Sequence, residues 1–115
     1  MTDQTNQNDQ NDQNDQIHGT IKTRANVYFD GKCVSHSIEL ADGKKLSVGV
    51  ILPARLTFNT GAPEVMELVG GACRVKLAGS DAWTDCAGGQ SFSVPGQSSF
   101  EIEVTQTLHY VCHFG

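Results

Sequence analysis

Apolar and polar side chains alternate with a period of two along much of this chain, a pattern that indicates β-strands rather than helices. The clearest case is residues 100–104, Phe-Glu-Ile-Glu-Val, where three apolar side chains share one face and two glutamates share the other. Residues 73–77 alternate in the same way. Strands of this kind must bury their apolar face against another layer of structure. The alternation therefore predicts an all-β domain.

The last alternating run, residues 108–114, divides its side chains between two faces. Leu108, Tyr110 and Cys112 lie on one face together with the final phenylalanine. His109 and His113 lie on the other face. We therefore expect the tyrosine and the cysteine to point into the domain and the histidines to point out of it.

Glycine-containing turn signals separate the alternating runs at short intervals. Asp42-Gly43 lies between residues 37–40 and 46–51 and predicts a hairpin with a type I′ turn, which needs positive φ at both central residues. Residues 63–68 begin with proline and could start a helix, but the glycines that follow favour a strand. Short strands at this spacing predict a sandwich or barrel. The other turn signals are Gly61-Ala62-Pro63, Gly70-Gly71, Gly79-Ser80-Asp81, Ala87-Gly88-Gly89 and Pro95-Gly96.

The N-terminal segment has a different composition from the rest of the chain. After Met1, the first sixteen residues contain no apolar side chain and repeat Gln, Asn and Asp. Such a segment cannot bury enough surface to offset its ordering entropy. We therefore expect a disordered tail over residues 1–19 and a single folded domain over residues 20–115.

The tail also carries much of the net charge of −5, because it holds four of the thirteen acidic residues and no basic ones. The remaining nine acidic and eight basic residues give a nearly neutral domain, which offers no electrostatic reason to bind nucleic acid or an anionic membrane. No segment approaches the ~20 apolar residues needed to span a bilayer.

The cysteines are irregularly spaced and form no Cys-x-x-Cys pair, and the N-terminus lacks a basic region followed by an apolar core. We therefore expect a cytoplasmic protein whose cysteines are reduced and buried. These are Cys33, Cys73, Cys86 and Cys112.

Two segments resemble the paired motifs of the cupin superfamily. The better match runs from Gly89 through five residues to Pro95-Gly96. The looser match is residues 58–64, followed by Gly71. The resemblance implies a jelly-roll β-barrel of the cupin type.

The positions that hold a metal in many cupins are altered here. Those motifs supply three histidines and a glutamate, and by spacing the histidine positions fall on Phe58, Thr60 and Phe100, so that only Glu64 is retained. A transition metal needs three or four converging N, O or S ligands. We therefore expect neither a metal nor another cofactor.

More narrowly, the chain resembles the family of small, single-domain pyrimidine/purine nucleoside phosphorylases, from about residue 26 to the C-terminus. The resemblance implies broad-specificity phosphorolysis of purine and pyrimidine ribonucleosides to free base and ribose 1-phosphate, by a metal-independent homodimer. The matching segments are residues 28–32, 47–50, 57–60, 63–66, 70–71, Trp83, 92–100 and 110–112.

Phosphorolysis of an N-glycosidic bond places three demands on a site. It needs an anion cradle for phosphate, a polar group for the ribose hydroxyls, and stabilisation of the departing base. Tolerance of many bases favours apolar and aromatic walls over a hydrogen-bonded base pocket. Strand parity places a set of this character in the barrel interior: Phe58, Thr60, Glu64, Met66, Phe100 and Tyr110.

Within this set, we expect Glu64 and Tyr110 to be catalytic. Glu64, with Thr60 beside it, is predicted to bind the ribose hydroxyls. Phe58, Phe100 and Tyr110 are predicted to contact the base, with Met66 as a further substrate contact. The alternative is that the aromatic side chains are ordinary barrel core and that Glu64 lies at an exposed loop edge.

The phosphate-binding residues carry no sequence motif, because no glycine-rich loop precedes a helix. A cation should therefore contribute, and we expect Lys45, matching a basic position in the family, together with the hydroxyl of Ser47. His109 or His113 could protonate the base, but their opposite parity argues against it. Other candidate cations, predicted on solvated strand faces, are Arg55, Arg74 and Lys76.

Two readings from other classes compete with the enzyme. One is a non-catalytic cupin that binds a small metabolite, and the other is a dimeric interaction module without chemistry. A metal-dependent dioxygenase or isomerase is not expected, because too few metal ligands are retained. The expected partners are thus a nucleoside, inorganic phosphate and a second copy of the chain.

Overall fold

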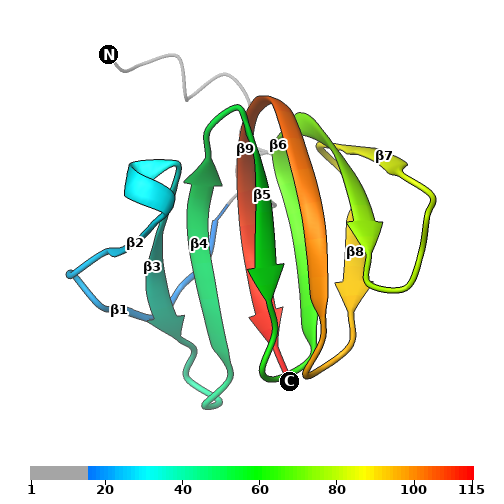
Figure 1. Ribbon diagram of the computed structural model, residues 1–115. Coiled ribbons are helices and arrows are strands. Elements are labelled where there is room, and N and C mark those ends of the chain that lie inside the picture. The colour runs from blue at the N-terminus through cyan, green and yellow to red at the C-terminus, as the bar shows by residue number, and fades with distance from the viewer. Residues whose placement is uncertain (1–15) are drawn as a thin grey trace.

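The computed structural model describes residues 16–115, in which short and long strands follow one another along the chain (Figure 1). Most of the expected tail, residues 1–15, lies outside the described residues. The strands are β1 (Thr20–Ile21), β2 (Asn26–Tyr28), β3 (Cys33–Glu39), β4 (Lys45–Ile51), β5 (Ala54–Asn59), β6 (Glu64–Leu77), β7 (Thr84–Ala87), β8 (Ser91–Val94) and β9 (Ser99–Phe114), with a 3₁₀ turn, η2 (Phe29–Gly31), after β2.

All nine strands join in one antiparallel sheet with the order β1-β3-β4-β9-β6-β7, to which β2 adds on β3, β5 on β9 and β8 on β6. The first part of β9 pairs with β5 and its last part with β4, whereas β6 pairs with both parts. The sheet therefore curls around the long β6–β9 pair into a roll (Figure 1). The prediction of an all-β jelly roll is confirmed.

The curl depends on irregular pairing in the middle of β6. The register between β6 and β9 shifts on both sides of Gly70 and again after Ala72. Gly71 has φ +92°, and a Cβ added there would collide with the carbonyl oxygen of Thr107. The glycine pair is therefore a β-bulge and not the turn that we predicted, since an extra residue kinks a strand without ending it. The strand predicted over residues 63–68 is confirmed.

The predicted hairpin joins β3 to β4, but its turn differs from the prediction. Leu40 N donates to the Lys44 carbonyl and Gly43 N to the Leu40 carbonyl, both at 2.9 Å. Gly43 has φ +90°, whereas Asp42 does not have positive φ. A three-residue loop that ends in a left-handed glycine replaces the type I′ turn, because only one residue takes positive φ.

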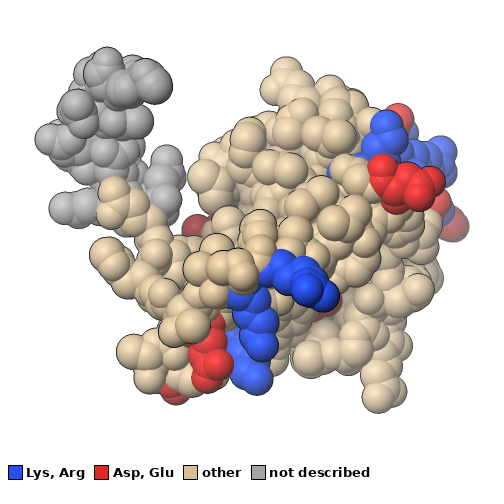
Figure 2. Space-filling view, turned by 90° about the vertical axis from the view of Figure 1, so that its left-hand side faces the viewer, with Lys and Arg blue, Asp and Glu red and all other residues tan. Residues whose placement is uncertain are grey.

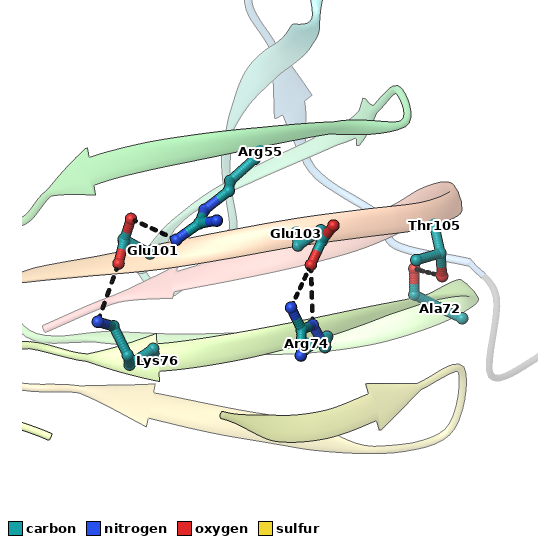
Figure 3. A network of polar contacts seen from close by, with 7 residues as sticks. All are labelled: Arg55, Ala72, Arg74, Lys76, Glu101, Glu103 and Thr105. Carbon is teal, nitrogen blue, oxygen red and sulfur yellow. Dashed lines mark hydrogen bonds and ion pairs between the residues drawn. The ribbon is translucent and has the colours of Figure 1, made fainter. Parts of the chain in front are cut away.

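The alternation along β9 separates a core face from a charged face, as predicted. Phe100, Ile102 and Val104 are at most 3% exposed. Between them, Glu101 and Glu103 point outward and pair with basic side chains of β5 and β6 (Figure 3). These basic residues are Arg55, Arg74 and Lys76, and all three also lie over the ring of Trp83.

The four cysteines are free and buried, as expected. Between residues 16 and 115, no helix is long and apolar enough to cross a membrane. The core that the cysteines join is built mainly from inward side chains of β6 and β9 and includes Ile51, Leu68, Ile102 and Leu108, each at most 1% exposed.

Candidate functional site

A cavity of about 260 Å³ opens inside the curled sheet. Its lining side chains come from six strands: β2, β3, β4, β5, β6 and β9. The volume is close to the lower end of the ~300–1,000 Å³ that small-molecule sites usually have. The cavity therefore has room for one small ligand.

Strand register explains why residues far apart in sequence meet in this cavity. Across the sheet, Ser37 of β3 pairs with Ser47 of β4, Ser47 with Cys112 of β9, and Cys112 with Met66 of β6. Directly paired residues point to the same face. One row of pairs thus places four inward side chains from four strands along the cavity wall.

Six of the eight predicted site residues line the cavity. They lie on β4, β5, β6 and β9, so the structure brings them together from across the whole sheet. Their roles stay predictions, but their common location is a finding. The six are Ser47, Phe58, Glu64, Met66, Phe100 and Tyr110.

Glu64 is the charged side chain of this lining, among the described residues, and lies at the start of β6. Burial raises the pKa of its carboxyl, and a hydrogen bond with the Cys112 thiol partly offsets that rise. The carboxylate is therefore partly desolvated, which strengthens its interaction with any positive charge in the cavity.

Tyr110 lies deeper, at 5% exposure, with its hydroxyl 3.4 Å from the Sγ of Cys33. Burial, followed by the hydrogen bond and proximity of Cys33, raises the pKa of this phenol above its ordinary value. The hydroxyl therefore keeps its proton at neutral pH. It can donate a hydrogen bond, but it cannot act as a general base.

Aromatic rings form one wall of the cavity. Phe58 stacks on Phe100 with centroids 5.4 Å apart, and Phe29 of η2 approaches Phe58 edge-on at 5.2 Å. Phe100 is 3% exposed and packs with the core, whereas Phe58 is half-buried. Phe58 thus presents more free surface to a ligand than Phe100 does.

Thr60 and Lys45 do not line the cavity. Thr60 Oγ1 donates to the Pro95 carbonyl at 2.7 Å and accepts from Ser98 N at 2.9 Å, which ties the end of β5 to the segment before β9. Lys45 is exposed and lines a separate depression with Lys22. That depression also reaches Ser37, so Lys45 lies at the rim of the site.

Several lining residues escaped the sequence analysis. β3 contributes Ser35 and Ser37, whose polar side chains are not typical of an interior face, and Cys33, which was predicted to be buried but not to belong to the site. The signal that could have found them was the predicted β3–β4 hairpin, since its register pairs Ser37 with Ser47. The remaining missed lining residues are Asn26, Tyr28, Ile51, Asn59, Cys112 and Phe114.

His109 and His113 point away from this cavity, as their parity predicted. They line a larger hollow of about 850 Å³ on the outer face of β4, β6 and β9. His113 Nε2 lies 2.9 Å from a carboxylate oxygen of Glu67 there. Of the eight predicted site residues, the lining of this outer hollow includes Tyr110 alone. The inner cavity is therefore the stronger candidate for the functional site.

The lining does not suit a transition metal. Phe58 and Phe100 offer no donor atom, and no group of three or more His, Cys, Asp or Glu side chains within residues 16–115 is placed to hold a metal ion. Burial and the neighbouring Glu64 raise the pKa of the Cys112 thiol to about 12, which disfavours the thiolate that a metal would need. The residues at the altered motif positions therefore do not form a metal site in the described part of the chain.

Comparison with known proteins identifies the family. The sequence model of the pyrimidine/purine nucleoside phosphorylase family matches residues 23–114. The chain belongs to this family. A Leptothrix cholodnii pyrimidine/purine nucleoside phosphorylase is 71% identical over 100 residues, which cover 86% of this chain and 96% of that protein.

Solved structures agree with the fold. A crystal structure of an Acinetobacter protein of unknown function has a TM-score of 0.84 at 48% identity, covering 87% of this chain and 98% of that one. An RmlC-like cupin from Shewanella frigidimarina has a TM-score of 0.64 at 14% identity, covering 86% of this chain and 90% of that one. This pyrimidine/purine nucleoside phosphorylase family member therefore has the predicted cupin fold.

Proposed function

We propose that this chain catalyses the phosphorolysis of purine and pyrimidine ribonucleosides in the inner cavity, releasing the free base and ribose 1-phosphate. Membership of the pyrimidine/purine nucleoside phosphorylase family supports the reaction class. One structural observation carries the choice of site: a partly desolvated carboxylate, Glu64, shares the cavity with the aromatic wall of Phe58 and Phe100.

Glu64 is assigned to the ribose. As the glycosidic bond breaks, positive charge develops on the sugar ring, and a carboxylate in a poorly hydrated cavity stabilises that charge more than it stabilises the neutral substrate. The same carboxylate accepts hydrogen bonds from ribose hydroxyls. Thr60, predicted beside it, contributes indirectly, because its hydroxyl is already bonded to Pro95 and Ser98.

The base is assigned to the apolar side of the cavity. Phe58, Phe100 and Met66 provide surfaces that accept purines and pyrimidines alike, since they make no base-specific hydrogen bond. The Tyr110 hydroxyl is the proton-bearing group of the lining best suited to donate a hydrogen bond to the base as negative charge develops on it. Phosphate is assigned to Ser47, with Lys45 at the rim.

Base release from uridine and inosine tests the proposal. Purified protein is incubated with each nucleoside, with and without phosphate and with a chelator, and products are separated by liquid chromatography. We expect release that requires phosphate and survives the chelator. Tight nucleoside binding without turnover would instead support the non-catalytic cupin.

Glu64→Gln tests the site, with Asp81→Asn as the matched control because Asp81 is exposed in the loop between β6 and β7. Loss of charge stabilisation should lower kcat/KM about 100-fold for every nucleoside. The control should keep wild-type activity. Unchanged turnover in Glu64→Gln would show that this carboxylate is not part of the site.

We also propose that the enzyme is a cytoplasmic homodimer, as the family resemblance implies. The outer hollow supports a contact between copies, because Val48, Val50, Val69 and Val111 line it and Val69 is 40% exposed. Sedimentation equilibrium at micromolar concentration should give twice the chain mass of 12.4 kDa. Val69→Asp should lower that mass, whereas Val27→Asp on β2 should not.

A further inference from the structure

Uncharged hydrogen-bonding side chains gather on one wall of the cavity, the wall formed by β2, β3 and β4. We call this group the serine wall and define it as Asn26, Ser35, Ser37 and Ser47. Strand register assembles it, since Asn26 pairs with Ser35 and Ser37 pairs with Ser47. Four small polar side chains thus face the cavity from three adjacent strands.

Asn26 connects two serines of the wall through hydrogen bonds to their hydroxyl oxygens. Asn26 Nδ2 donates to Ser35 Oγ at 3.3 Å and to Ser37 Oγ at 3.2 Å. Each serine oxygen is thereby an acceptor, so its own O–H can point elsewhere as a donor. The Ser37 hydroxyl can therefore donate into the cavity, whereas the Ser35 hydroxyl also hydrogen-bonds with Tyr110.

Ser47 provides a further, independent observation. This residue is 7% exposed and lines the cavity. It pairs directly with Ser37 across the sheet, so the two serines point to the same face. The Ser47 hydroxyl is therefore placed where it can donate a hydrogen bond to a ligand in the cavity.

Positive charge lies just outside the wall. Lys22 and Lys45, together with Glu39, line a depression that shares Ser37 and Phe114 with the cavity, so the two lysines leave a net positive charge there. Figure 2 shows lysine and arginine side chains on this side of the molecule, the side of β1, β2 and β3, with acidic side chains beside them. The wall itself carries no charge, and Glu64 lies on β6, three strands away from Ser37 along the sheet order.

We propose that the serine wall is the site of the inorganic phosphate co-substrate, an inference that rests on the proposed phosphorolysis. Phosphate oxygens only accept hydrogen bonds at their charged positions, and the wall supplies donors. The rim lysines attract the anion and offset part of its charge. Neutral donors hold it without an ion pair, so that its oxygen stays nucleophilic.

Phosphate-dependent kinetics test the wall. Ser47→Ala and the double variant Ser37→Ala/Ser47→Ala each remove donors to a charged ligand, which should raise the KM for phosphate roughly 10- to 100-fold while the KM for uridine stays within about twofold. Ser93→Ala, on the exposed side of β8, is the matched control and should match the wild type. Ser47→Thr restores a hydroxyl and should recover most of the affinity.

Direct binding separates this inference from the proposed reaction. Calorimetric titration with inorganic phosphate alone, at constant ionic strength in chloride, should show binding to the wild type and weaker binding to the double variant. That result would support the wall even if no nucleoside were cleaved. An unchanged phosphate KM and phosphate affinity in a double variant with a wild-type melting temperature would overturn it.

Discussion

The carboxyl of Glu64 makes stability depend on pH in a predictable direction. Burial raises its pKa in the folded state above the ordinary value of 4.5. The stabilising contribution is therefore fully present below about pH 4.5 and is lost as the pH rises through the folded-state pKa. The Glu64→Gln variant lacks this pH-dependent contribution to the free energy of unfolding. Its stability relative to the wild type should therefore be greater at pH 7 than at pH 4.

Urea unfolding at the two pH values measures this difference. Asp81→Asn is again the matched control, and its difference from the wild type should not grow toward neutral pH in the same way. A Glu64→Gln difference that is the same at pH 4 and pH 7 would contradict a desolvated carboxyl in the cavity.

Thiol reactivity reports on the same interior. Burial is the largest cause of the raised pKa at all four cysteines, and it brings the pKa of Cys73 to about 11 and helps to bring that of Cys112 to about 12. The thiolate is the reactive form. We expect Ellman's reagent at pH 7 to label the native protein very slowly and all four thiols after unfolding in urea.

Rapid labelling of one thiol in the native state would show that the cavity opens further than the structure indicates. Cys33 and Cys112 are the thiols to examine first, because both line the cavity. Cys33→Ala or Cys112→Ala would then remove the fast phase, whereas Cys73→Ala, on the same core but outside the cavity, would not.

Side-chain parity predicted much of the site, because in a strand it fixes which face a residue occupies. Glu64, Met66 and Tyr110 reach the cavity for that reason. Parity also placed Thr60 in the interior, but Thr60 does not line the cavity, because its hydroxyl hydrogen-bonds to the backbone of Pro95 and Ser98. Parity gave no reason to single out Ser35, because hydrophobicity is the usual sign of an inward residue.

Among the elements, the β-bulge in β6 tolerates the fewest residue types, because its backbone conformation and its close contacts both favour glycine. Gly71 combines positive φ with a close approach to the Thr107 carbonyl oxygen. An alanine there would pay about 1–2 kcal/mol for the left-handed backbone and more for the collision. We expect Gly71→Ala to lower the free energy of unfolding by more than about 2 kcal/mol.

Gly61→Ala is the matched control, since an added Cβ there meets nothing within 4 Å and its φ is not positive. Equilibrium urea unfolding of both variants gives the comparison. An effect of Gly71→Ala no larger than that of Gly61→Ala would mean that the bulge relaxes easily and does not hold the curl of the sheet.

The backbone geometry of turns and bulges could not be predicted from the sequence. Gly70-Gly71 and Asp42-Gly43 both carry the composition of turns, yet the first lies inside β6 and the second forms a loop with one positive φ at Gly43. A glycine permits several backbone conformations. Pairing with a distant strand, β9 in the first case, selects one of them, and that partner is not adjacent in sequence.

At the scale of the whole molecule, the fold was predictable because the long strands β6 and β9 alternate clearly and turn signals divide the rest of the domain into short strands. The curl was not, since it comes from β9 changing partners between β5 and β4 along its length. That exchange of partners also encloses the cavity. The barrel was thus visible in local patterns, whereas its interior volume depends on long-range pairing.

The domain boundary leads to the last prediction, for a variant that lacks residues 2–16. The first strand begins at Thr20, and the backbone bond from Lys22 to Ser37 lies beyond the deleted segment. We therefore expect an unchanged melting temperature and unchanged kcat/KM for uridine. The deletion removes four acidic residues and no basic ones, so the variant should leave an anion-exchange column at lower salt. A large loss of stability would place the start of the folded domain before residue 17, because only lost native contacts, and not lost charge on a solvated segment, could produce it.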